Sequence, residues 1–179
     1  MVFDTLKKRR SIRKYKKQPV ENEKIEKLIE TLVRSPSSRN QNPWEFIIVT
    51  NETLLGQLSK SKHHGSAFLK NAPLGIVICG NRKRSDVWVE DCSIASILVQ
   101  IVAESLHLGS CWIQIRKRMH SDSISSESYV RKVIDIPSRL KVESIIAIGY
   151  PDEEKTPHDK KNLVFDRISY DYYNCKKNE

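Results

Sequence analysis

The residues best suited to chemistry in this chain form a basic stretch close to its N-terminus, residues 7–15, with the sequence KKRRSIRKY. Six lysine or arginine residues and two hydroxyl side chains fall within these nine positions. Arginine binds phosphate through two parallel hydrogen bonds, and a serine hydroxyl is a further donor. On a continuing helix Arg9 and Arg13 would share one face, with Arg10 and Ser11 beside them. The stretch therefore predicts half of an anion-binding site.

The same charges also suit the end of a helix. Residues 2–10 have helical character, with Val2, Phe3 and Leu6 as apolar anchors close to one side. Lysine and arginine in a last turn complement the negative end of the helix dipole. From this stretch alone, a solvated basic helix end and a phosphate site both remain open.

The length and the cysteines limit the class of protein. A chain of 179 residues fits one domain that buries a core without disulfides or a metal. Cys79, Cys92, Cys111 and Cys175 lie far apart without a C-x-x-C pair, which argues against a zinc site and a disulfide-stapled scaffold. Without a secretory signal or a membrane-spanning run we expect a cytoplasmic protein, although residues 1–17 leave an organellar transit peptide as an alternative.

The charge balance favours anionic partners. The chain holds 31 lysine and arginine residues against 22 aspartate and glutamate residues, a net charge of +9. A nucleic-acid-binding protein is therefore a rival hypothesis, supported by the basic residues 82–84 near Trp88 and 116–118 near Trp112. The acidic residues are interleaved throughout, so the charge does not form a separate basic tail.

Alternating helices and strands must position the basic stretch. Strands are predicted at residues 44–50, 74–80, 111–115 and 142–148. Helices are predicted at residues 2–10, 21–34, after the N-cap Asn51, at 87–108 and at 126–134. The helix at 87–108 is apolar on several sides, and Leu108-Gly109 is expected to end it as a C-cap. This order indicates an α/β or α+β fold with a helix-covered sheet.

No glycine-rich phosphate loop accompanies these elements. The chain has neither G-x-G-x-x-G nor G-x-x-x-x-G-K-[ST], so the Rossmann fingerprint and the P-loop are both missing. If a phosphate binds, side chains must supply most of the donors.

Four segments together resemble the nitroreductase family of FMN-dependent oxidoreductases. They are RRSIRKY at 9–15, SPSSRNQNPWEFIIV at 35–49, LHLGSCWI at 106–113 and IIAIGYPDEEK at 145–155. The resemblance covers nearly the whole chain. It implies an α+β fold whose central, mainly antiparallel sheet is covered by helices, as a single domain over residues 1–179. It also implies an intertwined homodimer with two FMN sites at the interface, in which residues 152–179 form a tail that wraps the partner subunit.

The resemblance assigns cofactor-binding roles to two groups of residues. The group matching the segment that holds the FMN phosphate, ribityl chain and pyrimidine edge is Arg9, Arg10, Ser11 and Arg13. The group matching the loop that the partner places against the isoalloxazine ring is Pro36, Ser37, Ser38 and Asn40. A cation such as Arg13 near the pyrimidine edge would stabilise negative charge on reduced flavin.

A third group and one departure complete the expected site. Lys160 and Lys161 match a basic pair near the C-terminus that approaches the phosphate, where arginine is commoner in the family. Asn42 stands where glutamine is usual before Pro-Trp, and Gln114 stands where glycine is usual after Cys-Trp-Ile. We include Gln114 among the candidate cofactor-binding residues. The departures affect the expected substrate pocket more than the binding of FMN.

The family implies hydride transfer from NADH or NADPH through FMN to a nitroaromatic, quinone or related electrophile. No catalytic side chain and no metal are expected, because the flavin carries the chemistry. The expected partners are a second copy of the chain and a small-molecule substrate, with no specific nucleic acid and no membrane. A specialised flavin enzyme acting on another electrophile is the alternative within this fold, and a basic nucleic-acid-binding protein is the alternative from another class.

Overall fold

A four-stranded antiparallel sheet forms the centre of the computed structural model, which describes residues 2–176. The strands are β1 (Trp44–Val49), β2 (Leu74–Gly80), β3 (Gly109–Gln114) and β4 (Lys141–Gly149), in the spatial order β1-β2-β4-β3. The central strands β2 and β4 are buried almost throughout, which explains their nearly continuous apolar sequences. The α+β fold with a mainly antiparallel sheet is confirmed.

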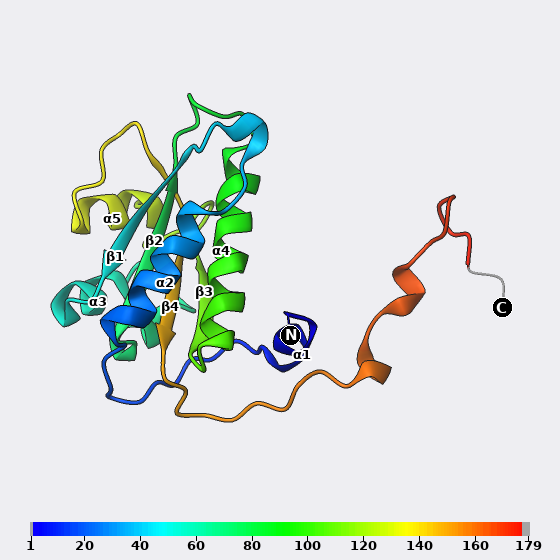
Figure 1. Ribbon diagram of the computed structural model, residues 1–179. Helices are drawn as coiled ribbons and strands as arrows, with labels where there is room; N and C mark the ends of the chain where they lie inside the picture. Colours follow the sequence, from blue (N-terminus) through cyan, green and yellow to red (C-terminus); the bar gives the residue numbers. More distant parts are fainter. Residues whose placement is uncertain (1, 177–179) are drawn as a thin grey trace.

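Helices cover both faces of this sheet (Figure 1). They are α2 (Asn22–Val33), α3 (Glu52–Leu58), α4 (Trp88–Ser105) and α5 (Ser126–Val133). A further helix, α1 (Val2–Lys8), has no buried residue and lies beside the C-terminal end of α4, away from the sheet (Figure 1). Alternate residues of β2 point to opposite faces, so Ile76 and Ile78 pack with α2 and α4, whereas Val77 and Cys79 pack with α3 and α5. Two apolar cores result, one on each face.

The basic stretch does not continue as a helix. The helix α1 ends at Lys8, and the chain then runs extended along the edge of the sheet. The Ile12 N–H donates to the Ser110 carbonyl at 3.0 Å, and the Lys16 N–H donates to the Tyr150 carbonyl at 2.9 Å. The expectation that Arg9 and Arg13 share a helical face was therefore wrong, because the backbone bonds to β3 and to the residues after β4 instead.

A close approach of two backbones makes this arrangement possible. A Cβ atom on Gly109 would lie 2.8 Å from the Cβ of Ile12, so only glycine leaves room for the buried Ile12 side chain. Gly109 is not the C-cap that the sequence predicted. The helix α4 ends earlier, with His107 in the left-handed conformation at a φ of 60°, and Gly109 begins β3.

The helix α4 is the longest in the fold and is apolar on more than one side. Val99 and Ala103 are buried against the sheet, whereas Ile94 and Ile97 are exposed on the opposite side. Within residues 2–176, no helix combines the length and the apolar character that crossing a membrane requires. The outer side of α4 is thus partly apolar, with Ile94 38% and Ile97 40% exposed.

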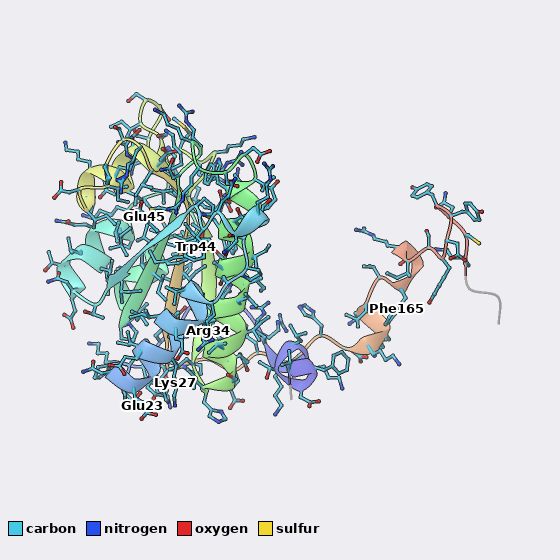
Figure 2. The ribbon with its side chains drawn as sticks, turned by 45° about the horizontal axis from the view of Figure 1, so that its top comes forward. Glu23, Lys27, Arg34, Trp44, Glu45 and Phe165 are labelled. Atoms are coloured by element: carbon cyan, nitrogen blue, oxygen red, sulfur yellow. The ribbon has the colours of Figure 1, made fainter. Side chains whose placement is uncertain are left out.

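The C-terminal segment from residue 152 projects away from the sheet and its helices (Figures 1 and 2). Its only helical turns are the short 3-10 segments Lys160–Asn162 and Phe165–Arg167 among the described residues. Its exposed apolar side chains are Leu163, Val164, Phe165, Ile168, Tyr170, Tyr172 and Tyr173. A tail without a core of its own was predicted, and its wrapping of a partner subunit stays a prediction.

The four cysteines are free thiols. Cys79, Cys92 and Cys111 are buried and Cys175 is exposed. Burial raises the pKa of Cys79 to about 12, so that thiol stays protonated at neutral pH. This state agrees with the prediction of reduced thiols.

We expect Gly109→Ala to destabilise the fold by roughly 1–3 kcal/mol, because its methyl group would push Ile12 off the edge of the sheet. Gly56→Ala is the matched control, since a Cβ on Gly56 has no heavy atom within 4 Å and lies inside α3. Alanine at this helical position should stabilise the fold by up to about 1 kcal/mol. Urea unfolding measures the free energy of unfolding of both variants. Equal changes in the two variants would contradict the argument that the close approach of Ile12 requires glycine at position 109.

Candidate functional site

The extended segment carrying Arg9, Arg10, Ser11 and Arg13 borders a pocket of about 250 Å³ at the C-terminal end of α4. The pocket is lined by Lys8, Arg10, Ile12, Glu104, His107, Leu108, Gly109, Pro151, Glu153 and Lys155. Three lysine or arginine side chains thus face two carboxylates, and Arg9 and Arg13 flank them on the same segment. The arrangement leaves positive charge in excess around the pocket.

Residues that follow β4 hold this segment in place. The Lys155 Nζ donates to the Ser11 carbonyl at 2.6 Å and lies 3.4 Å from the Glu153 carboxylate. The Glu153 carboxylate accepts hydrogen bonds from the backbone N–H groups of Arg13 and Lys14. The Arg13 N–H is the main reason that the pKa of Glu153 is lowered, with smaller contributions from Lys14 and Lys155. The carboxylate therefore stabilises the extended backbone while it is ionised.

Glu153 and Lys155 were not among the predicted site residues. Both belong to the run PDEEK after the last strand, which carried part of the family resemblance but no individual function. The signal that was available is a run of three acidic residues followed by Lys155, directly after a buried strand, in a chain with a cationic stretch elsewhere. Only the fold shows that the two segments lie side by side.

The side chains of Arg10 and Arg13 lie in different surroundings. The Arg10 guanidinium is half-buried and donates to the Thr156 carbonyl. The Arg13 side chain is exposed, and its guanidinium carbon lies 5.8 Å from the centre of the Phe68 ring. Arg10 is thus part of the pocket wall, whereas Arg13 projects beyond it along the surface.

The second predicted group lies at the other end of α4. The loop containing Pro36 and Ser37 leads into the 3-10 turn Ser38–Asn40, whose Ser38 N–H donates to Asp91 in the first turn of α4. Figure 1 shows this loop and the N-terminal segment at opposite ends of that helix. Asp91 and Glu104, which mark the two ends, are thirteen positions apart on the helix and so about 20 Å apart. Within one chain the two groups do not meet.

The Gln114 side chain is bound within its own chain. Its Oε1 accepts from the Trp112 indole N–H at 2.8 Å, and its Nε2 donates to the Glu143 carboxylate and to the Arg116 carbonyl, both at 3.2 Å. Glutamine at this position links β3 to the buried Glu143 of β4. Its predicted role in cofactor binding stays a prediction.

Lys160 and Lys161 lie on the projecting tail. Both side chains are exposed, and Lys161 forms an ion pair with Asp159 at 3.4 Å. Among the described residues, no hydrogen bond or ion pair joins the side chains of this pair to the Arg9–Arg13 segment. Their approach to a phosphate stays a prediction.

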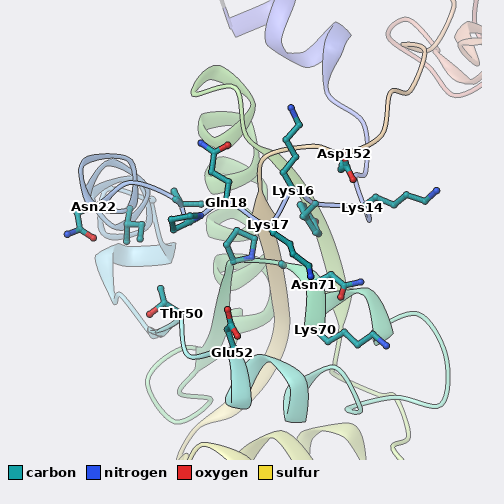
Figure 3. Close-up of a pocket in the computed structure, with 16 residues that line it drawn as sticks. Lys14, Lys16, Lys17, Gln18, Asn22, Thr50, Glu52, Lys70, Asn71 and Asp152 are labelled. Atoms are coloured by element: carbon teal, nitrogen blue, oxygen red, sulfur yellow. The ribbon is translucent and has the colours of Figure 1, made fainter.

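A larger groove of about 1200 Å³ lies beside the segment 14–20 and was not predicted. Its charged lining residues are Lys14, Lys16, Lys17, Lys70, Glu52 and Asp152. Figure 3 shows Lys14, Lys16 and Lys70 pointing in different directions instead of converging on one point. In this groove four lysines face two carboxylates, so it also carries positive charge in excess.

The aromatic residues invoked for the nucleic-acid hypothesis belong to the core. Trp88 and Trp112 are half-buried and pack against the cluster formed by α2, α4 and the sheet. The Arg116 guanidinium carbon lies 5.8 Å from the Trp88 ring centre, over its face. Neither ring is displayed as a platform on which bases could stack.

Comparison with known proteins decides the family. The sequence model of the nitroreductase family matches residues 6–65 and 55–150. The chain belongs to the nitroreductase family. Its membership confirms the resemblance seen in the sequence and makes it an enzyme of the oxidoreductase class.

Similar nitroreductases are known from sequence and structure. A solved FMN-dependent nitroreductase from Clostridium difficile R20291 is 45% identical, with a TM-score of 0.94 over 96% of this chain and 99% of that one. A protein of Archaeoglobus fulgidus, provisionally named NADH dehydrogenase/NAD(P)H nitroreductase, is 34% identical over 82% of this chain and 83% of its own. The iodotyrosine deiodinase of Thermotoga neapolitana is 24% identical over 92% of this chain and 96% of its own.

Glu143 lies on β4 and is buried, with 3% of the residue exposed. Its Oε2 has no hydrogen-bond partner among the described residues, and the Arg116 Nε lies 3.8 Å away. Burial raises the pKa of Glu143 above its ordinary value of 4.5, opposed by the hydrogen bond from Gln114 and the charge of Arg116. The folded state therefore binds this proton more tightly than the unfolded state.

We expect Glu143→Gln to remove a pH-dependent contribution to stability. Because the folded-state pKa is raised, the wild-type fold gains stability from this group as pH falls through that pKa towards 4.5. The variant should lack this gain and be at least as stable as the wild type at about pH 7. Urea unfolding at about pH 5 and pH 7 measures the free energy of unfolding of the wild type and the variant. The control is Glu26→Gln on the exposed face of α2. If the change in the free energy of unfolding between these pH values is the same in Glu143→Gln as in the wild type, Glu143 is not its source.

Proposed function

We propose that this nitroreductase is an FMN-dependent oxidoreductase that uses NADH or NADPH to reduce electrophilic small molecules. The observation that carries the proposal is the extended Arg9–Arg13 segment, held by Lys155 and Glu153 against a small pocket with excess positive charge. Such a segment presents several donors at one place in a fixed conformation. The FMN phosphate is a dianion that requires several donors.

The pocket fits the phosphate end of FMN better than the whole molecule. Its volume of about 250 Å³ is below the roughly 300–1,000 Å³ usual for a complete small-ligand site. The guanidinium of Arg10 and the ammonium of Lys155 line it, and both are already oriented by bonds to backbone carbonyls. The ring system must therefore be bound by residues outside this pocket, and a second surface is required to cover it.

We propose that a second copy of the chain provides that surface. The Ser38–Asn40 turn cannot reach the Arg9–Arg13 segment of its own chain, because α4 separates them. In a dimer with a two-fold axis each chain can offer its turn to the other chain's basic segment. Exposed apolar side chains on α4 and on the tail support such an interface, since they would otherwise face water. Residues 152–179 would then wrap the partner, with Lys160 and Lys161 near its phosphate.

Bound FMN would supply the hydride chemistry, accepting hydride from NADH or NADPH and delivering it to the acceptor. The chain's own residues would bind the cofactor and orient it. Arg10 and Lys155 in the pocket, with the adjacent Ser11, would hold the phosphate end, and the exposed cation of Arg13 would stabilise negative charge on the ring. No side chain is required as a nucleophile or a general base. We expect this chemistry in the cytoplasm, where NADH and NADPH are available.

We infer the class of electron acceptor from the names of the similar proteins. Nitroaromatics and quinones are the first candidates, because the similar proteins from Clostridium difficile and Archaeoglobus fulgidus are named as nitroreductases. A relative named iodotyrosine deiodinase supports the alternative of a specialised enzyme acting on another electrophile. A screen of reductant-dependent turnover across these acceptor classes separates the two.

We expect the purified protein to be yellow and to hold about one FMN per chain, because the donor set suits one dianion. Arg10→Ala with Arg13→Ala should release the flavin, since hydrogen bonds to charged groups contribute roughly 1.5–3 kcal/mol each. The matched control is Arg34→Ala with Arg139→Ala, which removes two exposed arginines that pair with Glu30 and Glu45. FMN affinity is measured from the quenching of flavin fluorescence.

Three results would contradict this proposal. Colourless protein that does not take up added FMN would remove the flavin from the mechanism. Unchanged FMN affinity in the Arg10 and Arg13 double variant would place the phosphate elsewhere. Equal losses in the double variant and in its control would show a general effect of charge and not a specific site.

A further inference from the structure

A buried carboxylate lies at the base of the turn that carries Ser38 and Asn40. Asp91 is 2% exposed and sits in the first turn of α4. Its Oδ1 accepts from the Ser38 backbone N–H at 2.9 Å, and its Oδ2 accepts from the Ser85 hydroxyl at 3.2 Å. Among the described residues no lysine or arginine forms an ion pair with it. The positive end of the α4 dipole and these two donors are what compensate its charge.

The turn that Asp91 contacts has an unusual backbone. Arg39, Asn40 and Asn42 adopt positive φ values of 52°, 53° and 45°, a conformation that side-chain-bearing residues rarely adopt. The Ser37 hydroxyl adds a local bond, accepting from the Asn42 N–H at 2.9 Å. Strained backbone of this kind persists only where the surroundings over-determine it, and it concentrates at ligand-binding sites. Asp91 is the buried group on α4 that accepts a hydrogen bond from the Ser38–Asn40 turn.

We propose that Asp91 is a positioning residue for the flavin site of the partner subunit. Its carboxylate fixes the Ser38–Asn40 turn in the strained shape that is presented to the other chain's FMN. This inference rests on the proposed function and deepens it, because it assigns a role to a residue that never touches the cofactor. A lesion at Asp91 therefore acts in trans, on the site containing the partner's basic segment.

Two substitutions at Asp91 separate the hydrogen bond from the charge. Asp91→Ala removes the acceptor, so FMN should bind about tenfold more weakly or worse as the turn relaxes. Asp91→Asn keeps an oxygen for the Ser38 N–H and offers an N–H to the Ser85 hydroxyl, so it should retain most of the affinity. Ser96→Ala is the matched control on the same helix, since it removes a buried hydrogen bond to Ser144 without touching the turn. It should lower stability and leave FMN affinity unchanged.

A pair of substitutions at Ser38 tests the same bond from the other side and does not disturb the core. Ser38→Pro removes the N–H donor, and Ser37 already has the extended backbone, φ −139° and ψ 154°, that a residue before proline requires. Ser38→Ala removes the hydroxyl but keeps the N–H. If the bond to Asp91 shapes the turn, FMN affinity falls more in Ser38→Pro than in Ser38→Ala.

The decisive experiment uses mixed dimers of the full chain. An Asp91→Ala chain and an Arg13→Ala chain, carrying different affinity tags, are co-expressed and the mixed dimer is isolated. If Asp91 acts in trans, one site carries both lesions and the other is intact. About half of the wild-type FMN content and turnover should then return, as expected for one of two symmetric sites.

The outcomes separate the two proposals. If wild-type protein binds FMN but neither site of the mixed dimer recovers wild-type FMN affinity, Asp91 acts within its own chain, which overturns this inference and leaves the proposed function standing. Wild-type FMN affinity in Asp91→Ala also overturns it. Wild-type protein that does not bind FMN overturns the proposed function and this inference with it. Recovery in the mixed dimer, together with an unchanged affinity in Ser96→Ala, supports it.

Discussion

The contact between Ile12 and Gly109 is the constraint on which the candidate site depends. Because Gly109 has no side chain, the segment after α1 lies directly against the edge strand β3 and bonds to Ser110 through its backbone. The arginines on that segment are thereby fixed relative to the sheet. The residues after β4 complete the arrangement, with Glu153 accepting backbone N–H groups and Lys155 donating to the Ser11 carbonyl.

The helix α4 separates the two groups of proposed site residues within one chain. One end adjoins the basic pocket, through Glu104 and His107, and the other holds the Ser38–Asn40 turn through Asp91. A helix is a stiff spacer of about 1.5 Å per residue, so this separation is built into its length. The same helix exposes Ile94 and Ile97 on its outer side. Spacing and exposed apolar surface together favour a site shared between two chains.

The charged side chains have different surroundings in the basic pocket and at the Ser38–Asn40 turn. At the pocket, cations outnumber carboxylates and remain partly accessible, which suits an anionic ligand. At the turn, the Asp91 carboxylate is buried and its donors come from its own chain, which suits a structural task. Glu143 is a third case, in which burial raises the pKa and one oxygen remains without a hydrogen-bond partner.

The sequence by itself determined the four strands, the main helices and the family. These follow from local periodicity and from motifs whose order along the chain is visible without a fold. It did not determine that residues 9–13 are extended, because their helical pattern is overridden by backbone bonds to Ser110 and Tyr150, which are distant in the chain. Nor did it reveal Glu153, Lys155 or Asp91 as supporting residues. Each acts on a residue more than fifty positions away, and only the tertiary structure decides which distant residues become neighbours.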